Sequence, residues 1–283
     1  MRLSEANKIF ERHPGCILCG NHFYKRLFNM GSTNIISCGR CGLTKTGNFK
    51  TPVYKKYHRD DDYQKDEWLY KNFFQKRVKN IQKYYSKPGR VLDIGCSTGI
   101  LLQLLKARDW EVWGVEPSKS GEVAGRRGIK VVRQNFETAR LPKDYFDVII
   151  LNHTLEHLEN PVVILQKARK LLNKGGTVFV DVPNFGGLSS KIMGKRWGYL
   201  TPREHHWHFT PSSLKSVFRK TNLEVIYQET ASGIFDFGSP LKGLMGKLVH
   251  TRKSFFVDLS TTPLAYLYSK IGLGANLTII GKK

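Results

Sequence analysis

The sequence contains no long apolar run and no apolar core near its start. No stretch of roughly 18 or more apolar residues occurs in its 283 residues, so we expect no membrane-spanning segment. Because residues 1–15 have no apolar core, we also expect no signal peptide and a cytoplasmic protein. Internal repeats and low-complexity segments are absent too, and the length allows one domain with a small additional module.

Acidic residues are scarce relative to basic ones. The chain has 23 Asp and Glu residues against 46 Lys and Arg, which gives a formal net charge of +23 spread along its length. Such a charge favours acidic partners, namely RNA, phosphorylated or nucleotide-linked small molecules, or peripheral contact with an anionic membrane surface. A generally basic proteome or a solubility effect would give the same excess, so the charge selects no partner by itself.

Cysteine is also scarce, and four of the five cysteines form two pairs near the start. Cys16 and Cys19 make one C-x-x-C pair, Cys38 and Cys41 make the other, and each pair is followed by glycine. This spacing is typical of a four-thiolate zinc site, which is closed and therefore structural rather than catalytic. Disulfides fit a reducing cytoplasm less well, while bound iron or a redox pair are the alternatives.

Two short strands are expected between these pairs, over residues 23–28 and 33–37. Together with the four cysteines they predict a zinc-ribbon-like module over residues 1–50. His13 and His22 lie nearby but are surplus to a set of four thiolates. The module is too small to own a core, so metal binding has to stabilise it.

Residues 90–99 combine a strand, a tight turn and the start of a helix. Apolar residues flank Asp93, Gly95 and Gly99 bracket the turn, and the apolar residues 100–105 continue as a helix. Glycine permits unusual backbone dihedral angles and close approach to a ligand, which is how nucleotide-like ligands are held. Cys96 lies inside this turn, where we expect a small buried side chain.

A second strand ends about 20 residues later at Glu116, where a ribose-binding carboxylate belongs. A carboxylate there accepts from both ribose hydroxyls at once. Ser97 stands where a dinucleotide-binding turn has its middle glycine, so nothing makes room for a pyrophosphate, and Asp93 suits a cationic ligand better. A Rossmann-like fold that binds a different nucleotide is the alternative.

The combination of Asp93, the glycine turn and the acidic Glu116, without a pyrophosphate cradle, resembles motif I of the class I S-adenosylmethionine-dependent methyltransferases. The resemblance implies a Rossmann-like sheet of seven strands, the last antiparallel, with the ligand at the carboxyl ends of the strands. It also implies that Asn135 and Phe136 hold the adenine. The residues expected to bind S-adenosylmethionine are Asp93, Gly95, Cys96, Gly99, Glu116, Pro117, Asn135, Phe136, Asn152 and His153.

Strands and helices alternate along the rest of the chain, which predicts an α/β fold with a parallel sheet and helices on both faces. Strands are expected over residues 129–132, 146–151, 177–182, 223–227 and 277–280, with a helix over 161–172 and a turn at 173–176. An earlier helix over 63–85 has Trp68 on its apolar side and Lys and Arg on the other. In the family, such a helix covers the cofactor.

The predicted division is a ribbon over residues 1–50, a linker and covering helix over 51–89, and a methyltransferase domain over 90–283 with a cap insertion at about 232–274. Residues 152–161 and 182–184 make the domain similar to the bacterial ubiquinone-biosynthesis-type O-methyltransferases. The ribbon ahead of it resembles that of sugar C-methyltransferases. Ribosomal-RNA guanine methyltransferases also carry an N-terminal zinc module, usually with a His ligand, whereas all four candidates here are Cys.

Methyl transfer from a sulfonium is an in-line displacement, and a hydroxyl or acidic carbon acceptor must also lose a proton. Histidine suits this step near neutral pH. We predict that His205, in the family's H-x-x-x-F-T pattern, and His157 serve as base or substrate anchor. Buttressing of the cofactor loop is the alternative for His157, and the spacing of His205, His206 and His208 is compatible with a metal site without being diagnostic.

The leading hypothesis is O- or C-methylation of a sugar, a lipid precursor or another secondary metabolite. Basic and apolar residues interleave over 232–274, which suits an anionic or lipid-linked acceptor or, alternatively, a plain helical cap. An RNA methyltransferase that grips phosphate with its ribbon is the second hypothesis, although no Asn-Pro-Pro-Tyr-like motif follows the fourth strand. A non-catalytic scaffold is the third, and the intact Asp93, Gly95 and Glu116 argue against it.

Overall fold

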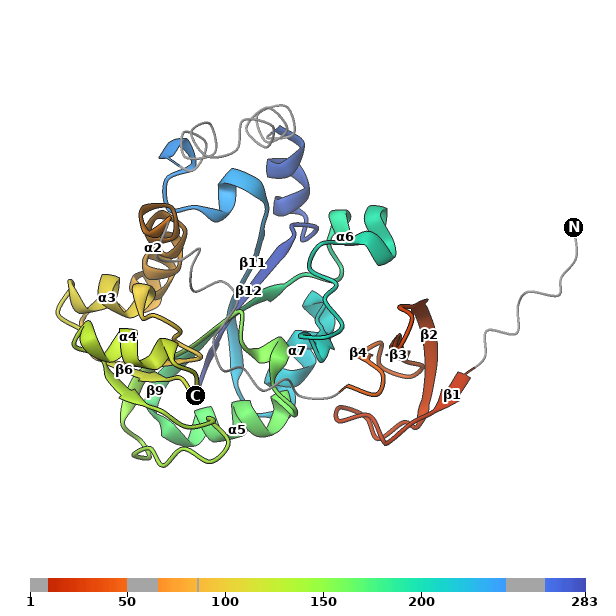
Figure 1. The fold of residues 1–283 in the computed structure, drawn as a ribbon, viewed down its shortest axis with the longest axis horizontal. Helices are drawn as coiled ribbons and strands as arrows, with labels where there is room; N and C mark the ends of the chain where they lie inside the picture. Colours follow the sequence, from red (N-terminus) through yellow and green to blue (C-terminus); the bar gives the residue numbers. More distant parts are fainter. Residues whose placement is uncertain (1–9, 50–65, 86, 243–262) are drawn as a thin grey trace, which may run out of the picture.

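Two β-sheets organise the chain (Figure 1). The structure is a computed structural model and describes residues 10–49, 66–85, 87–242 and 263–283. The larger sheet consists of β5 (Arg90–Ile94), β6 (Glu111–Val115), β7 (Lys130–Val132), β8 (Phe146–Asn152), β9 (Leu172–Pro183), β11 (Glu224–Ala231) and β12 (Asn276–Lys282). Within the described residues its order is β11-β12-β9-β8-β5-β6-β7.

The pairing directions of the larger sheet follow the alternation of strands and helices. Strands β5 to β9 pair in parallel, because the chain crosses back over the sheet between them. The last strand, β12, lies between β9 and β11 and is antiparallel to both. The predicted Rossmann-like sheet with an antiparallel last strand is confirmed, and the carboxyl ends of β5, β6 and β8 lie at one edge.

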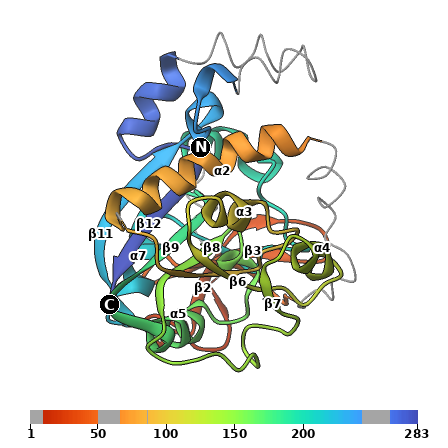
Figure 2. The same ribbon diagram turned by 90° about the vertical axis from the view of Figure 1, so that its left-hand side faces the viewer.

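Helices cover both faces of the larger sheet. They are α2 (Glu67–Tyr84), α3 (Ile100–Lys106), α4 (Ser120–Arg126), α5 (Pro161–Leu171), α6 (Leu188–Met193) and α7 (Pro211–Lys220), with the 3-10 turns η2 (Leu155–His157), η3 (Gly194–Arg196) and η4 (Gly233–Asp236). Figure 2 looks onto the face covered by α2, α3 and α4, whose apolar side chains form one core, while α5 and α7 contribute to the core of the other face. No helix in the described segments has the length and hydropathy to cross a bilayer.

The central strands differ from the predicted bounds at one place. The stretch 173–176, predicted as a turn, belongs to β9, which starts at Leu172 opposite Phe146. A register shift between Phe146 and Val148 accommodates this start, so the glycines of the stretch lie in an irregular strand rather than in a turn. Helix α5 accordingly ends at Leu171, one residue before the predicted end.

Helix α2 departs from the predicted division into an apolar and a basic face. Arg77 is 1% exposed, although it was assigned to the solvent side, whereas Trp68 is 45% exposed. Arg77 is buried because it pairs with two carboxylates, those of Asp181 and Asp236. The helical periodicity of apolar residues depends on residue types and not on their partners, so it could not predict that Arg77 is buried. The predicted first residues of this helix, 63–65, lie outside the described residues.

The smaller sheet joins the N-terminal ribbon to the methyltransferase domain. Its strands are β1 (Phe10–Arg12), β2 (Phe23–Asn29), β3 (Asn34–Cys38), β4 (Thr44–Thr46) and β10 (Trp207–His208), in that order. Strand β4 pairs antiparallel with β10, and Ile36 and Leu43 belong to the same core as α5 and α7. The ribbon therefore shares the core of the domain, and Figure 1 shows it packed beside α7. The sequence did not predict this docking.

Candidate functional site

A tight turn joins β5 to α3 and requires glycine at both ends. Gly95 has a φ of 77°, and a Cβ there would lie 2.6 Å from Oγ1 of Thr154. Gly99 has a φ of 80°, and a Cβ there would lie 2.3 Å from Cδ1 of Ile129. Other residues rarely adopt such left-handed dihedral angles, and neither position has room for a side chain. The turn thus brings backbone close to the loop after β8.

The carboxylate of Glu116, at the end of β6, holds this turn in place. One of its oxygens accepts the N–H of Ser97 and the other accepts the N–H of Ser118, both at 3.0 Å. Each carboxylate oxygen has a further lone pair, so two hydroxyls of a ligand can still donate to the group. Glu116, the predicted ribose-binding residue, therefore has its side chain held in position by these two hydrogen bonds.

A cavity of about 650 Å³, called here the central cavity, opens where β5, β6 and β8 end. The predicted site residues that line it are Asp93, Gly95, Cys96, Glu116, Pro117, Asn135, Phe136, Asn152, His153 and His157. Gly99 and His205 do not line it, because Gly99 packs against Ile129 and His205 lines a neighbouring cavity. Phe74 of α2 and Thr154 also line the central cavity, and sequence analysis had not assigned either of them.

Two buried oxygens of this cavity have no hydrogen-bond partner among the described residues. They are Oδ1 of Asp93 and Oδ1 of Asn152. Burial, reinforced by the nearby carboxylate of Glu116, raises the pKa of Asp93 well above its usual value. A buried acceptor of this kind needs a donor or a cation. S-adenosylmethionine has both an ammonium group and a sulfonium, so these residues fit the cofactor that the resemblance implies.

The loop after β7 carries the predicted adenine-binding residues. Phe136 is buried while Asn135 is exposed at the cavity wall. Lys167 of α5 fixes the loop because its Nζ donates to the carbonyl oxygens of Phe136 at 2.5 Å and Ala139 at 2.8 Å. Helix α5 therefore holds the backbone of this part of the cavity wall.

A small cavity of about 20 Å³ adjoins the central cavity and shares His153 and His157 with it. Glu156, His157 and His205 meet there, each with one ligand atom within 4.8 Å of the others. The rings of His157 and His205 stand perpendicular, with their centroids 4.7 Å apart. Glu156 is 1% exposed, and sequence analysis missed it because glutamate is ordinarily a surface residue.

Burial and charge set the protonation of this histidine and glutamate cluster. Burial opposes the ionisation of Glu156, but His153 and His157 hold its pKa at about 2. Burial lowers the pKa of His205 to about 4, so its ring is neutral at neutral pH. For His153 burial acts in the same direction, yet the carboxylates of Glu156 and Asp181 raise its pKa. His153 therefore forms an ion pair with Glu156, at 3.5 Å, when it is protonated.

The other two histidines of the predicted cluster belong to the interface with the ribbon. His206 stacks on Phe49 with ring centroids 4.5 Å apart, and Nε2 of His208 lies 3.1 Å from Oγ1 of Thr46. Within the described residues, His205, His206 and His208 do not assemble as one set of metal ligands. His206 directly precedes β10 and His208 is its second residue, so both lie at the strand that pairs with β4 of the ribbon.

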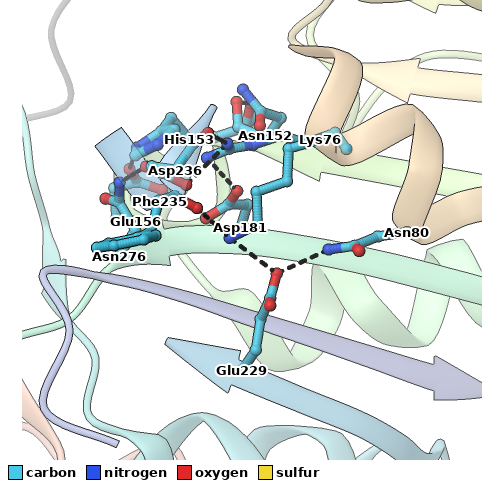
Figure 3. Close-up of polar contacts among 12 residues, drawn as sticks. Lys76, Asn80, Asn152, His153, Glu156, Asp181, Glu229, Phe235, Asp236 and Asn276 are labelled. Atoms are coloured by element: carbon cyan, nitrogen blue, oxygen red, sulfur yellow. Dashed lines mark hydrogen bonds and ion pairs between the residues drawn. The ribbon is translucent and has the colours of Figure 1, made fainter. Parts of the chain in front are cut away.

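A buried polar network lies beside His153 and includes Asp181 and Asp236 (Figure 3). Nη2 of Arg77 is 2.6 Å from Oδ2 of Asp181, and its Nη1 is 2.8 Å from Oδ1 of Asp236. The carbonyl oxygen of Asp181 accepts the N–H of His153 at 2.8 Å, and Asn276 donates to Asp236. The network therefore joins α2, β9, η4 and β12 to the residue that follows β8.

The four ribbon cysteines lie together, as predicted. Sγ of Cys16 is 3.5 Å from that of Cys41, and Sγ of Cys19 is 3.5 Å from that of Cys38. These distances exceed the roughly 2.05 Å of a disulfide. They are close to the roughly 3.8 Å between two sulfurs on one tetrahedral zinc with Zn–S bonds of about 2.3 Å. Although burial opposes it, backbone N–H groups of Cys41 and Arg40 lower the pKa of Cys38 to about 7, which favours a thiolate.

Comparison with known families identifies the class of this chain. A family described as methyltransferase domain matches residues 65–228, which is more than half of the chain, so the chain belongs to that family. Its relatives and its fold are those of the class I S-adenosylmethionine-dependent methyltransferases, which confirms the predicted class.

Individual relatives are similar to the chain over part of its length. An uncharacterized protein of Methanocaldococcus jannaschii is 30% identical over 147 residues, 51% of this chain and 67% of that protein. The ubiquinone biosynthesis O-methyltransferase of Cereibacter sphaeroides is 28% identical over 157 residues, 48% of this chain and 61% of that enzyme. This match spans less than two thirds of the enzyme. A solved S-adenosylmethionine-dependent methyltransferase from Thermotoga maritima shares the fold, with a TM-score of 0.54 and 21% identity over 80% of this chain and 96% of that one.

Proposed function

We propose that the chain transfers the methyl group of S-adenosylmethionine to an oxygen or a carbon of a small-molecule acceptor. The observation that carries this proposal is the central cavity, whose wall combines buried acceptors for a cationic cofactor with two histidines. When bound, the cofactor supplies an electrophilic methyl group. The residues of the chain bind and orient the two reactants and accept or relay the acceptor's proton.

The cofactor would be held by groups from three strand ends. The unpaired oxygen of Asp93 suits the ammonium group, and Glu116 suits the ribose hydroxyls while it keeps its two bonds to the turn. Asn135 and Phe136 suit the adenine, because Lys167 fixes their loop at the cavity wall. The cavity volume of about 650 Å³ lies within the range of small-molecule sites.

Activation of the acceptor is assigned to the cluster of Glu156, His157 and His205. His157 lines both cavities, so it meets an acceptor that enters the central one. His205 lies behind it, in ring contact at 4.7 Å, and donates from Nδ1 to the carbonyl oxygen of Tyr199 at 2.9 Å. We therefore assign contact with the acceptor to His157 and a positioning role to His205.

A small molecule is the favoured acceptor class. The relatives named ubiquinone biosynthesis O-methyltransferases support methylation of such an acceptor, which we take to be a sugar, a lipid precursor or another secondary metabolite. The match covers 48% of this chain and 61% of the enzyme. We favour a small molecule over RNA because of the two cavities at the sheet edge, and we give the overall positive charge less weight.

The direct test uses the full-length chain with methyl-labelled S-adenosylmethionine and a cell extract separated into nucleic-acid, lipid and small-molecule fractions. Label in the lipid or small-molecule fraction supports the proposal, whereas label in nucleic acid overturns it. Calorimetric titration with S-adenosylmethionine, run in parallel, separates loss of cofactor binding from absence of the right acceptor. A chain that fails to bind the cofactor would be a scaffold rather than an enzyme.

We also propose that Cys16, Cys19, Cys38 and Cys41 hold a structural zinc ion. The separations between the four sulfurs support this assignment. At least one zinc per chain is expected in the purified protein. A Cys38→Ser variant should lose this zinc and unfold at a lower temperature, because β4 of the ribbon pairs with β10 of the domain. Absence of zinc from protein purified without chelator would contradict the proposal.

The predicted boundaries at residues 50, 89 and 283, the cap at about 232–274 and its contact with an anionic or lipid-linked acceptor stay predictions. Residues 243–262 of the cap lie outside the described residues. Leu241, Leu264 and Leu267, on either side of them, are exposed. A vesicle-flotation assay with anionic lipids tests the membrane contact directly.

A further inference from the structure

The small cavity contains a set of side chains that differs from an ordinary general base. Glu156, His157 and His205 present three ligand atoms within 4.8 Å of one another. We propose that Glu156, His157 and His205 bind a divalent cation at the wall of the central cavity. Its catalytic role, holding an oxygen of the acceptor, rests on the function proposed above, whereas the binding itself does not.

The hydrogen bonds of the two histidines fix which nitrogen faces the cavity. Nδ1 of His157 lies 3.0 Å from the carbonyl oxygen of Glu204, and Nδ1 of His205 lies 2.9 Å from that of Tyr199. A carbonyl oxygen only accepts, so each Nδ1 carries a proton, and Nε2 is the nitrogen of each ring that can offer a lone pair to an ion. Histidines that ligate metals typically have this arrangement, in which the second nitrogen donates to a carbonyl or carboxylate.

Glu156 makes the same centre strongly electron-rich. Its side chain is 2% exposed, and neither carboxylate oxygen accepts a hydrogen bond within the described residues. Nδ1 of His153 lies 3.5 Å from Oε1 of Glu156 and balances part of the carboxylate's charge. Nε2 of His157 lies farther away, 4.0 Å from the same Oε1. A buried carboxylate whose oxygens accept no hydrogen bond is unfavourable unless a cation lies beside it. Either a metal ion or an additional proton on a ring would relieve this arrangement.

The space and the chemistry of the cavity fit an ion better than a proton alone. Its volume of about 20 Å³ exceeds the roughly 10–15 Å³ that a single water needs. Thr201, which also lines it, contributes a buried hydroxyl oxygen without a hydrogen-bond partner among the described residues. Ligands about 2.1 Å from one ion lie roughly 3–3.5 Å apart, so side-chain shifts of about 1 Å would complete the site.

Two histidines and one carboxylate leave coordination positions open for a substrate, and they suit ions such as Zn²⁺, Fe²⁺ or Co²⁺. Because His157 lines both cavities, such a position can face an acceptor in the central cavity. A hydroxyl bound there would lose its proton to water, and its oxygen would form a bond to the methyl group as the methyl–sulfur bond of the cofactor breaks and S-adenosylhomocysteine leaves with the electron pair of that bond. The ion lowers the pKa of the hydroxyl and is neither oxidised nor reduced.

Titration of Co²⁺ into the full-length chain, loaded with a single equivalent of zinc at the four cysteines, tests the binding by visible absorption. We expect one equivalent to give the bands of nitrogen- and oxygen-ligated Co²⁺ without the near-ultraviolet charge-transfer bands of thiolate-bound Co²⁺, which separates this site from the cysteines. Glu156→Gln keeps the shape but removes the anionic ligand, so its Co²⁺ affinity should fall at least tenfold. Glu224→Gln, at an exposed position of β11, is the matched control and should bind as the original chain does.

Two outcomes would overturn the site. One is a wild-type chain that has zinc at its four cysteines and shows no nitrogen- and oxygen-ligated Co²⁺. This result would count against the site whether or not the Glu156→Gln variant folds. The other is equal Co²⁺ affinity in the wild-type chain and a folded Glu156→Gln variant. Neither measurement involves methyl transfer, so a negative result leaves the methyltransferase proposal standing with the cluster acting through a proton. Conversely, Co²⁺ binding by a chain that labels no acceptor would uphold the site and not the reaction.

Discussion

Replacement of Arg77 by methionine tests how strongly the buried network holds α2 to the sheet. The guanidinium is fully buried between Asp181 and Asp236 and lies 3.6 Å over the ring of Phe73. Methionine keeps much of the apolar contact but leaves two buried carboxylates without their cation. Removal of one partner from a buried ion pair typically costs about 3–5 kcal/mol. For a chain of this length that corresponds to a fall of roughly 6–20 °C in the midpoint of thermal unfolding.

The assay is thermal unfolding followed by circular dichroism, at fixed protein and zinc concentrations. Arg133→Met is the matched control, because Arg133 pairs with Glu122 at 2.9 Å with both side chains about half exposed. Such surface pairs contribute about 0–1 kcal/mol, so the control should shift the midpoint by only a few degrees. The double variant Arg77→Met with Asp236→Asn should lose less than the sum of the two single variants, because it removes one stranded charge.

The reasoning is refuted if Arg77→Met lowers the midpoint no more than Arg133→Met does. Strict additivity in the double variant would also contradict it, since additivity means that Arg77 and Asp236 do not depend on each other. An effect confined to cofactor binding, with an unchanged midpoint, would assign the network to the site rather than to stability.

Three further predictions concern the turn, the cofactor and pH. Gly95→Ala should weaken S-adenosylmethionine binding at least tenfold in calorimetry, because a φ of 77° costs alanine about 1–2 kcal/mol and its Cβ has no room, whereas Gly125→Ala, in open space, should bind normally. Asp93→Asn should weaken the same binding by roughly 10- to 100-fold, the loss of a charge-assisted hydrogen bond worth about 1.5–3 kcal/mol, and Glu224→Gln should not; equal affinities would remove Asp93 from the cofactor site. Burial lowers the pKa of His208 from 6.5 to about 3, so only the unfolded chain takes up this proton between those values. The resulting stability is complete above pH 6.5 and declines as the pH falls towards 3, by about 2 kcal/mol at pH 5, and His208→Gln should flatten this part of the pH profile of unfolding.

The sheet and the wall of the central cavity could be predicted from the sequence for one physical reason. Parallel strands end at a common edge, so residues that follow strands separated by 20 to 60 positions meet there whatever the loops do. Asp93, Glu116, Asn135 and Asn152 all follow or end such strands and all line the cavity. Gly99 was grouped with them by motif, but its role is to let α3 approach Ile129.

The small cavity could not be predicted in the same way. His205 reaches His157 through a loop whose path depends on packing against the ribbon, which no local pattern encodes. Arg77 was placed on the solvent side of its helix and Glu156 was assigned no role, because both residue types are usually exposed, and only their partners explain why they are buried. In both cases the missing information was a contact between distant parts of the chain.

The pairing of β4 with β10 has a consequence for synthesis of the chain on the ribosome. Thr46 donates to the carbonyl oxygen of His205, 159 residues later, so the edge of the ribbon acquires its neighbour only after most of the chain has been made. At roughly 5–20 residues per second, that edge waits about 8–30 seconds for its partner. During this interval an unpaired strand is open to other chains, so the ribbon would need its metal or a chaperone before the domain arrives.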